Sequence, residues 1–353
     1  MDVKALILKH YELYPGMQTQ DVVKLLYQNE FGPGHFIADE AESLQRLQEE
    51  WTSLEAFSTD KAAFEYIGNN LCRLYLGALK DSGISLKTIN RFFVNTANSV
   101  QGSIEAFEEK LDILKESCKE GLLPYPAEEL EGYLSSYRER GYPPVSHSEK
   151  YRALYSPAYR VVRKEYCDFF EIFLRIDSLL ESKEIVNVAI DGNSGAGKST
   201  LASMIGSIYE CNIFHMDDFF LTPGLKTKER LEEAGGNVDY VRFKKEVLDG
   251  INSGAPFQYR RYDCKRMSFG PPISVSKKRL NIIEGSYSMH PTLVKNYDLK
   301  IFLYIDKEEQ YSRILERNGP SMAKRFFDEW IPLEDRYFEE LKIKEQSDLV
   351  FKG

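Results

Sequence analysis

The run Ile190–Thr200 constrains this chain more than any other stretch of its sequence. Its part Gly192–Ser199 fits the pattern G-x-x-x-x-G-K-S, which is typical of loops that bind phosphate groups. The preceding segment, Glu184–Ile190, is short and rich in β-branched residues, so it predicts a buried strand. The following segment, Leu201–Ile208, repeats its apolar residues with helical spacing. The sequence therefore predicts a strand, a glycine-rich turn and a helix in direct succession.

Such a turn concentrates several backbone N–H groups and the positive end of a helix dipole at one place, which suits a polyphosphate. Glycine is needed where a Cβ would block the approach of the backbone or where φ is positive. In this arrangement Lys198 would reach the β- and γ-phosphates, and the Ser199 hydroxyl would hold Mg²⁺. We expect the nucleotide to be bound by Gly192, Asn193, Ser194, Gly195, Ala196, Gly197, Lys198, Ser199 and Thr200.

Length and composition indicate an ordinary soluble protein of two domains. The chain has 353 residues, of which 42% are hydrophobic and 29% charged. Its net charge of −9 argues against a nucleic-acid-binding surface, and no apolar run is long enough to span a membrane. The start of the chain lacks the features of a secretory signal. Scattered cysteines without a C-x-x-C pair favour a reducing, cytoplasmic setting and give no zinc site: Cys72, Cys118, Cys167, Cys211 and Cys264.

The two parts of the chain differ in their patterns. Residues 1–182 predict a mostly helical domain, since apolar residues with helical spacing alternate with Gly, Pro and Ser-Gly breaks. The helices expected there are Gln20–Glu30 with Thr19 as its cap, Ala38–Leu54, Ala63–Asp81, Ser85–Ser99, Ser103–Glu120 and Ala127–Arg140, followed by an apolar segment Tyr159–Leu180. No strand pattern of comparable strength appears before residue 184.

Residues 183–353 instead alternate strands with helices, which predicts an α/β fold with a parallel sheet flanked by helices. After Glu184–Ile190, the expected strands are Asn212–His215, Arg279–Ile283, Leu299–Ile305 and Ser347–Phe351. The expected helices are Leu201–Tyr209, Tyr240–Asn252, Lys307–Asn318 and Met322–Lys342. The fold class is therefore a P-loop NTPase sheet preceded by a separate, mostly α-helical N-terminal domain.

Acidic residues follow two of these strands. Asp217 and Asp218 come directly after the second strand, and Glu284 ends the third. Ligands of such sheets bind at the carboxyl ends of the strands. Glu284 would lie beside the phosphate-loop strand and reach Mg²⁺ directly or through water. The Asp pair would accept a proton from an acceptor hydroxyl.

Several motifs together resemble the uridine kinase family, within a wider group that includes nicotinamide riboside kinase, phosphoribulokinase and pantothenate kinase. The resemblance covers residues 184–353. It rests on the phosphate loop together with the runs Asp217-Asp218-Phe219-Phe220, Val238-Asp239-Tyr240, Tyr262-Asp263, Ile283-Glu284-Gly285 and Arg313-Ile314-Leu315-Glu316-Arg317. It implies an ATP- and Mg²⁺-dependent kinase that phosphorylates a hydroxyl of a nucleoside-like acceptor.

The same resemblance implies roles for single residues. Asp217 would be the catalytic base, assisted by Lys198 and Arg317. The acceptor would be bound by Asp218, Asp239, Tyr262 and Asp263, and Mg²⁺ by Ser199 and Glu284. Arg313 and Arg317, with Arg325 beside them, would belong to a lid over the phosphates. The family's lid is often more basic than the run 312–325 here, so which arginine reaches the transferred phosphoryl group stays open.

Other features leave alternatives open. The basic run 258–269 would suit an acceptor that already carries a phosphate or carboxylate, or a loop that folds onto ATP. His35 and His147 would pair in a second site, but lone histidines near turns favour helix connections instead.

The helical domain would be a regulator, a dimerisation surface that makes a homo-oligomer, or a wall of the acceptor pocket. An NTP-dependent switch that acts on a protein partner through this domain is the alternative to a kinase.

Overall fold

The computed structural model describes residues 2–54 and 62–353. The chain divides into two compact units, Met1–Leu174 (unit 1) and Arg175–Gly353 (unit 2). The division falls inside helix α9 (Phe170–Ser182), whereas the sequence pattern changes after residue 182. The predicted range 1–182 also includes residues 1 and 55–61, which lie outside the described part of the chain.

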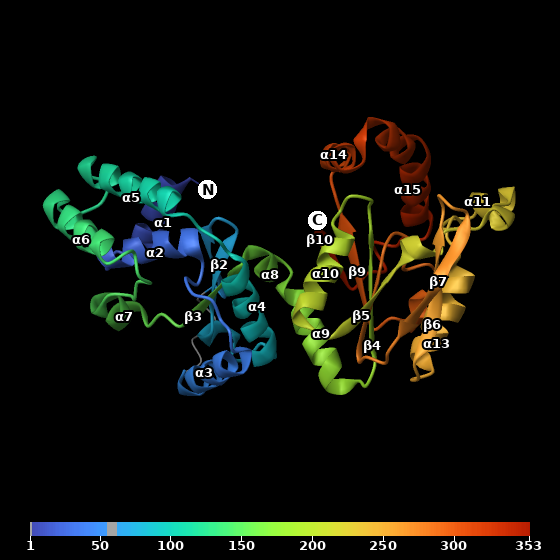
Figure 1. Ribbon diagram of the computed structural model, residues 1–353, viewed down its shortest axis with the longest axis horizontal. Helices are drawn as coiled ribbons and strands as arrows, with labels where there is room; N and C mark the ends of the chain where they lie inside the picture. The colour runs from blue at the N-terminus through green and yellow to red at the C-terminus, as the bar shows by residue number, and fades with distance from the viewer. Residues whose placement is uncertain (1, 55–61) are drawn as a thin grey trace. The chain divides into compact units, whose positions relative to one another are not determined.

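Unit 1 is built mainly from helices, and short polar side chains cap several of them. Asp39 and Ser103 accept hydrogen bonds from backbone N–H groups in the first turns of α3 and α5. The expected cap of the second helix was wrong by one residue, since Gln18 and not Thr19 precedes it. The helices are α1 (Val3–Leu13), α2 (Thr19–Phe31), α3 (Glu40–Ser53), α4 (Leu86–Ser99), α5 (Ile104–Lys119), α6 (Ala127–Glu139), α7 (Glu149–Tyr155) and α8 (Lys164–Asp168) (Figure 1).

The helix expected over Ala63–Asp81 was wrong, because this segment contains strands. β1 (Phe64–Gly68) and β2 (Leu71–Tyr75) form a hairpin, and β3 (Tyr159–Arg163) pairs antiparallel with β2. Asn69 and Asn70 make the turn with φ values of 48° and 55°, in the left-handed region that Asn tolerates better than most residues. A pair of Asn residues between two β-rich runs was the available signal.

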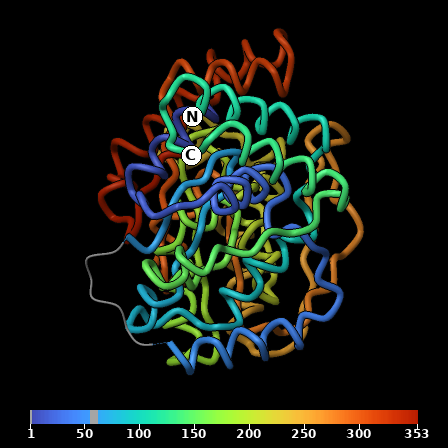
Figure 2. The backbone as a smooth tube through the Cα atoms, turned by 90° about the vertical axis from the view of Figure 1, so that its left-hand side faces the viewer, coloured from blue at the N-terminus to red at the C-terminus, as the bar shows by residue number. Residues whose placement is uncertain are grey.

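Apolar helix faces form the core of unit 1. A cluster of buried side chains joins α1, α2, α5 and α6, with Phe107, Leu111 and Leu114 of α5 fully covered. α3 contacts α4, and the path of this blue-to-green part of the chain can be followed in Figure 2. The helices thereby hold the loops between them in fixed places.

Unit 2 contains a parallel sheet of five strands in the order β10-β9-β4-β8-β5. The phosphate-loop strand β4 is central, with β8 on one side and β9 on the other. All five strands that the sequence predicted are present, and the predicted neighbour relation of β4 and β8 is confirmed. The bounds are β4 (Val186–Gly192), β5 (Cys211–His215), β8 (Leu280–Glu284), β9 (Leu299–Tyr304) and β10 (Leu349–Lys352) (Figure 1).

Helices flank this sheet, and α10 packs directly on β4, β5 and β8. They are α10 (Lys198–Ile208), α11 (Lys228–Glu232), α12 (Tyr240–Phe243), α13 (Asp249–Asn252), α14 (Lys307–Arg325) and α15 (Ile331–Glu340), with π-helical turns at Lys244–Leu248 and Phe326–Trp330. Sequence reasoning missed the hairpin of β6 (Phe257–Asp263) and β7 (Ser268–Val275). Among the described residues, no helix combines the length and the apolar character that a membrane crossing needs.

Candidate active site

The phosphate loop joins β4 to α10 in a conformation that requires its glycines. Gly192, Gly195 and Gly197 have φ values of 137°, 82° and 88°. A Cβ on Gly192 would lie 1.9 Å from the backbone oxygen of Leu303 on the neighbouring strand. Because only glycine fits there, the loop can turn tightly and place its backbone N–H groups at the start of α10. The predicted succession of strand, glycine-rich loop and helix is confirmed, and nucleotide binding by this loop stays a prediction.

Lys198 lies inside this loop. Its Nζ donates hydrogen bonds to the backbone oxygens of Gly192 and Asn193, at 2.8 and 3.0 Å, and to Ser286 Oγ at 3.2 Å. These contacts hold the ammonium group next to the loop and beside the end of β8. Phosphate oxygens that entered the loop would meet this positive charge.

Ser199 and Glu284 lie side by side. Ser199 Oγ is 3.1 Å from each carboxylate oxygen of Glu284, and the Glu284 side chain is buried. A hydroxyl and a carboxylate supply the oxygen ligands that Mg²⁺ prefers, and Mg²⁺ in kinases takes its other ligands from water and phosphates. The pair therefore fits a magnesium ion bound together with a nucleotide.

His215, at the end of β5, is a further neighbour of Glu284. Its ring Nδ1 contacts a carboxylate oxygen of Glu284. The hydrogen bond to Glu284 raises the pKa of His215, against the opposing effect of burial. His215 thus helps to orient the Glu284 carboxylate, whose Oε1 it shares with Ser199.

Asp217 lies in the short 3₁₀ turn after β5. Its side chain remains open to solvent, yet surrounding protein atoms strip part of its hydration. This desolvation raises the pKa of Asp217, as does the Glu284 carboxylate, while Lys198, His215 and Arg317 act in the opposite direction. The structure thus places Asp217 within electrostatic reach of the phosphate-loop lysine. Its role as a base stays a prediction.

Asp218 and Asp239 each already have a cationic neighbour. Arg261 Nε lies 3.0 Å from Asp218 Oδ2, and Arg242 Nε lies 3.5 Å from Asp239 Oδ2. Asp239 also caps α12, since its carboxylate accepts a hydrogen bond from the backbone N–H of Arg242 at 3.0 Å. An acceptor hydroxyl at either carboxylate would therefore share it with an arginine. The arginines were not among the predicted site residues.

Tyr262 and Asp263 belong to the β6–β7 hairpin. The Tyr262 side chain is buried against Phe269, with ring centroids 5.3 Å apart. Asp263 accepts hydrogen bonds from the backbone N–H groups of Lys265 and Arg266 in the hairpin turn, at 2.8 and 3.1 Å. Their contacts are thus structural ones within the hairpin, and substrate binding by either stays a prediction.

Cys264 follows Asp263 in the turn of this hairpin, and its thiol is influenced by Asp217. Burial first, and then the Asp263 and Asp217 carboxylates, raise the pKa of the Cys264 thiol, against the effect of Lys226. Cys264 in the hairpin turn therefore lies within electrostatic reach of Asp217.

The predicted lid arginines differ in their surroundings. Arg313 donates a hydrogen bond to the backbone oxygen of Gly195 in the phosphate loop, at 3.1 Å. Arg317 and Arg325 are exposed and contact the aromatic rings of Phe326 and Trp330 from 5.8 and 5.1 Å. Arg313 is the one of the three with a direct contact to the loop among the contacts described.

Glu334 is a buried carboxylate that sequence reasoning missed. It projects from α15 and accepts hydrogen bonds from Ser194 N at 3.0 Å, Ser194 Oγ at 2.6 Å and Ser286 Oγ at 2.8 Å. No short motif marks it, because it lies 140 residues from the loop that it contacts. Its helical spacing with the buried Tyr337 and Phe338 was the only hint that it faces inward.

Comparison with known proteins gives likenesses to kinases. No protein-family model matches the chain. The structure of a possible uridine kinase from Bacillus stearothermophilus is 20% identical with a TM-score of 0.38, covering 51% of this chain and 99% of its own. A protein from Silicibacter sp. TM1040 that is proposed to be a fructose transport system kinase is 21% identical with a TM-score of 0.41, covering 49% of this chain and 95% of its own.

A third structure, shikimate kinase from Bacteroides thetaiotaomicron, is 14% identical with a TM-score of 0.24 and covers 47% of this chain and 85% of its own. Each likeness extends over about half of this chain. The P-loop fold of unit 2 follows from its strand order and loop geometry without them.

Proposed function

We propose that unit 2 is an ATP-dependent kinase that transfers the γ-phosphoryl group of ATP to a hydroxyl of a small, nucleoside-like molecule. The observation that carries this proposal is the gathering of different chemical groups at the carboxyl ends of three adjacent strands. The phosphate loop follows β4, the Ser199–Glu284 pair joins α10 to β8, and Asp217 follows β5. Phosphoryl transfer needs these three elements: an anion nest, a metal site and a carboxylate near the acceptor.

The residues would act mainly by positioning and by electrostatic stabilisation. Phosphoryl transfer proceeds through a loose transition state, so little covalent chemistry falls to the protein. Lys198 would neutralise charge on the equatorial oxygens of the transferred group. Asp217 would orient the acceptor hydroxyl and take its proton late in the reaction. Its raised pKa brings it closer to the value that a proton acceptor needs near neutral pH.

Ser199 and Glu284 would hold Mg²⁺, which supplies charge neutralisation on the phosphate oxygens when it is bound. The hydrogen bond from His215 would keep the Glu284 carboxylate turned toward the ion. Arg313, which already contacts the phosphate loop, would be the lid arginine nearest to the nucleotide.

The acceptor side is the more basic part of the site. Arg242 and Arg261 contact Asp239 and Asp218, and Arg260 lies over the ring of Phe269 with its guanidinium carbon 4.8 Å from the centroid. We propose that these arginines select an acceptor with a negative group besides its hydroxyl. A homo-oligomer formed through unit 1 remains part of the proposal, with no nucleic acid or membrane as partner.

The test measures ADP release and phosphorylated product with the full chain, Mg²⁺-ATP and a panel of nucleosides, nucleotides, sugars and pantothenate-like alcohols. At least one acceptor should raise ADP release well above the rate with water alone. Asp217→Asn should abolish transfer while ATP binding by calorimetry stays largely intact. Asp249→Asn, an exposed carboxylate on α13 with the same charge change, is the matched control.

Two outcomes would contradict the proposal. Full activity in Asp217→Asn would remove this carboxylate from the mechanism. ATP hydrolysis that no acceptor accelerates, together with nucleotide-dependent capture of a protein, would favour the NTP-dependent switch instead.

A further inference from the structure

Unit 1 contains a cavity of about 540 Å³, well away in sequence from the phosphate loop. Its wall is formed by α2, the loop 33–38, α3, Phe93 of α4, the segment around His147, and β3. Pockets of a few hundred cubic ångströms are the usual size for small-molecule sites. His35 and His147, which we expected in mere helix connections, both line this cavity.

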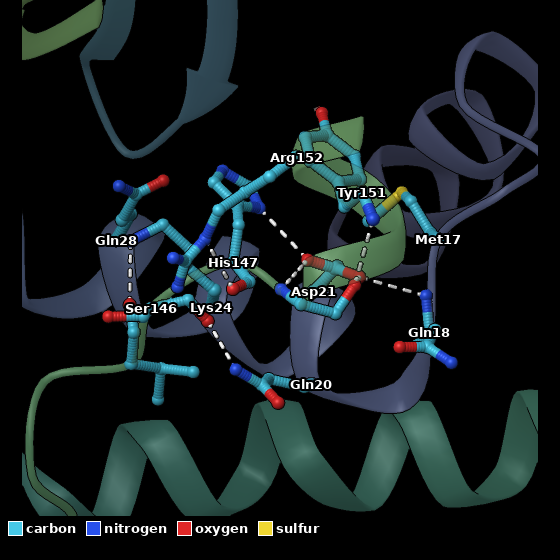
Figure 3. Close-up of polar contacts among 12 residues, drawn as sticks. Met17, Gln18, Gln20, Asp21, Lys24, Gln28, Ser146, His147, Tyr151 and Arg152 are labelled. Carbon is cyan, nitrogen blue, oxygen red and sulfur yellow. Dashed lines mark hydrogen bonds and ion pairs between the residues drawn. The ribbon is translucent and has the colours of Figure 1, made fainter. Parts of the chain in front are cut away.

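A buried hydrogen-bond relay forms one side of the cavity. Asp21 accepts a hydrogen bond from His147 Nδ1 at 2.9 Å, and its other bonds come from the backbone of Gln18 and from Ser148. Figure 3 shows these bonds converging on the Asp21 carboxylate. With Nδ1 donating to Asp21, His147 Nε2 accepts from Tyr159 Oη at 2.6 Å. These hydrogen bonds hold the side chains of His147 and Tyr159, which line the cavity, in place.

The polar groups next to this relay are also paired. Gln28 Oε1 accepts two hydrogen bonds from the buried Arg73 guanidinium, at 3.0 and 2.8 Å, and Gln28 Nε2 lies 3.3 Å from Tyr159 Oη. Arg73 in turn is paired with Glu65 at 3.1 Å. Behind this part of the wall, the charges of Arg73 and Glu65 therefore balance each other.

Lys24 is different from the other cations that line the cavity. Arg46 and Arg160 form ion pairs with Glu42 and Glu50, at 2.5 and 2.7 Å. In the part of the chain that the structure describes, Lys24 forms no ion pair, and its Nζ donates to the backbone oxygen of Val145 at 2.6 Å. Burial first, and then Arg73, lower the pKa of Lys24 to about 8. An incompletely neutralised ammonium group in a concave site attracts an anion.

Flat apolar side chains line the same cavity. The Phe36 side chain is 73% exposed, which is unusual for a phenylalanine, and Phe93 lies beneath the Arg160 guanidinium at 5.4 Å. Exposed aromatic rings at the rim of a pocket indicate a ligand with an apolar surface of its own. The cavity thus combines one available cation with two ring surfaces.

We propose that this cavity is a second ligand site, which binds a small organic anion with its carboxylate or phosphate at Lys24 and its flat apolar part against Phe36 and Phe93. The proposal concerns unit 1 and is independent of the kinase assigned to unit 2. Tyr159 and His147 form the polar side against which the ligand rests. Among the other described charged side chains that line the cavity, Arg46 and Arg160 form ion pairs and Asp39 caps α3, so the ammonium group of Lys24 is the one left to attract an anion.

The test uses chemical footprinting of the full chain with benzoate, phenyl phosphate and the neutral analogue benzamide as probes. An N-hydroxysuccinimide ester of acetate labels lysines near pH 8, where the Lys24 amine, with its pKa of about 8, is already partly deprotonated. Benzoate or phenyl phosphate should slow acetylation of Lys24 several-fold, benzamide should not, and Lys150 on α7 should label at an unchanged rate. The anion that slows acetylation of Lys24 more shows whether the site prefers carboxylate or phosphate.

Calorimetry with the protective anion then tests the role of the charge. Lys24→Met should weaken its affinity roughly tenfold, as loss of one charge-assisted hydrogen bond would. Lys150→Met removes the same charge from an exposed position and should change nothing. Equal protection by benzamide, no protection by either anion, or unchanged affinity in Lys24→Met would overturn the proposal. The footprint on the unsubstituted chain remains decisive if Lys24→Met folds poorly.

Discussion

Asp21 in unit 1 and Asp191 in unit 2 each accept four hydrogen bonds, but their carboxyl groups ionise differently. Neither side chain has exposed surface. Asp21 accepts hydrogen bonds from Gln18 N, His147 Nδ1, Ser148 N and Ser148 Oγ. Asp191 accepts them from Gly192 N, Tyr287 N, Met289 N and Tyr337 Oη. Yet the pKa of Asp21 lies below its usual value, and the pKa of Asp191 is raised to about 6.

The difference lies in what opposes burial. Burial raises the pKa of both carboxyl groups, but at Asp21 the hydrogen bonds from His147, Ser148 and Gln18 outweigh it. At Asp191, the bonds from Met289, Gly192 and Tyr337 and the charge of Lys198 only reduce the effect of burial. The absence of exposed surface and an equal number of donors therefore do not fix the charge of a carboxyl group, because protein atoms surround Asp191 more completely than Asp21. The surroundings of Asp21 in unit 1 thus favour its ionised form, whereas those of Asp191, behind the phosphate loop of unit 2, favour its neutral form.

The largest effect that we expect is on the rate of phosphoryl transfer, and it should arise in unit 2 and not in unit 1. Lys198→Met removes the cation from the phosphate loop, and we expect phosphoryl transfer to fall roughly 10⁴-fold, because charge on the transferred group loses its main protein partner. Lys150→Met removes the same charge from the unit that contains Asp21 and should leave the rate unchanged. Product formation at saturating ATP measures both. A loss of similar size in both variants would mean that the two units do not work separately.

A matched pair of substitutions tests the two aspartates directly. Asparagine resembles a neutral carboxyl group, so it should harm the site that holds an anion more than the site that tolerates the neutral form. At about pH 5.5 we expect Asp21→Asn to lower the free energy of unfolding of unit 1 by about 4 kcal/mol. Asp191→Asn should cost unit 2 only about 1–2 kcal/mol under the same conditions.

The two tryptophans of the chain make this measurement specific for each unit. Trp51 lies on α3 in unit 1 and Trp330 lies in unit 2. Replacing one of them by Phe leaves the other as the fluorescent reporter of denaturant-induced unfolding. Equal losses of stability at the two positions, or a larger loss at Asp191, would contradict the distinction between the two carboxyl groups.

The two units also differ in how much of them the sequence could predict. The phosphate loop is encoded within the contiguous run Gly192–Ser199, and the segments directly before and after it predicted the strand and the helix. The cavity of unit 1 joins Lys24, Phe93 and His147, which the chain brings together only through tertiary packing. Such contacts cannot be predicted from local sequence patterns. The hairpin Phe64–Tyr75 was mistaken for a helix because its turn signal was short.

Within unit 2, the same limit applies to single residues. The pairing of Ser199 with Glu284 could be predicted because parallel strands bring their carboxyl ends to one edge. The contacts of Glu334 with Ser194 and of Arg261 with Asp218 could not, since they depend on how α15 and the β6–β7 hairpin pack. The sequence therefore predicts the parts of the site that the sheet itself aligns.

The stability of the two units should also depend differently on pH. Burial lowers the pKa of His147 to about 4, below its unfolded value near 6.5. Between these values the unfolded chain binds more protons, so unit 1 should lose roughly 3 kcal/mol as the pH falls from about 6.5 to about 4. Unfolding of the Trp330→Phe protein, followed through Trp51, measures this loss. His147→Gln should flatten the profile over the same range.

In unit 2 the contribution of Asp191 has the opposite sign. Its folded pKa of about 6 lies above its unfolded value, so the stability that it contributes is present at low pH and is lost as the pH rises through about 6. His290, whose pKa burial lowers to about 4, acts the other way in the same unit. The ¹³Cγ chemical shift of Asp191 isolates the single group, and it should titrate near pH 6, while that of Asp21 should titrate at a lower pH, because its pKa lies below the usual value. Titration of both carboxyl groups at one pH would refute the comparison.

The smallest expected effect concerns Glu334, a third buried carboxylate, which lies against the phosphate loop itself. Its carboxylate accepts hydrogen bonds from Ser194 and Ser286, so it places negative charge where phosphate oxygens would approach. Glu334→Gln keeps the shape of the side chain and removes this charge. We expect the affinity for a non-hydrolysable ATP analogue to rise roughly fivefold, or about 1 kcal/mol, measured by calorimetry. Glu339→Gln, an exposed position on the same helix, should leave the affinity unchanged. Weaker binding in Glu334→Gln would show instead that the carboxylate holds Ser194 in place for the nucleotide, as Asp21 holds His147 in unit 1.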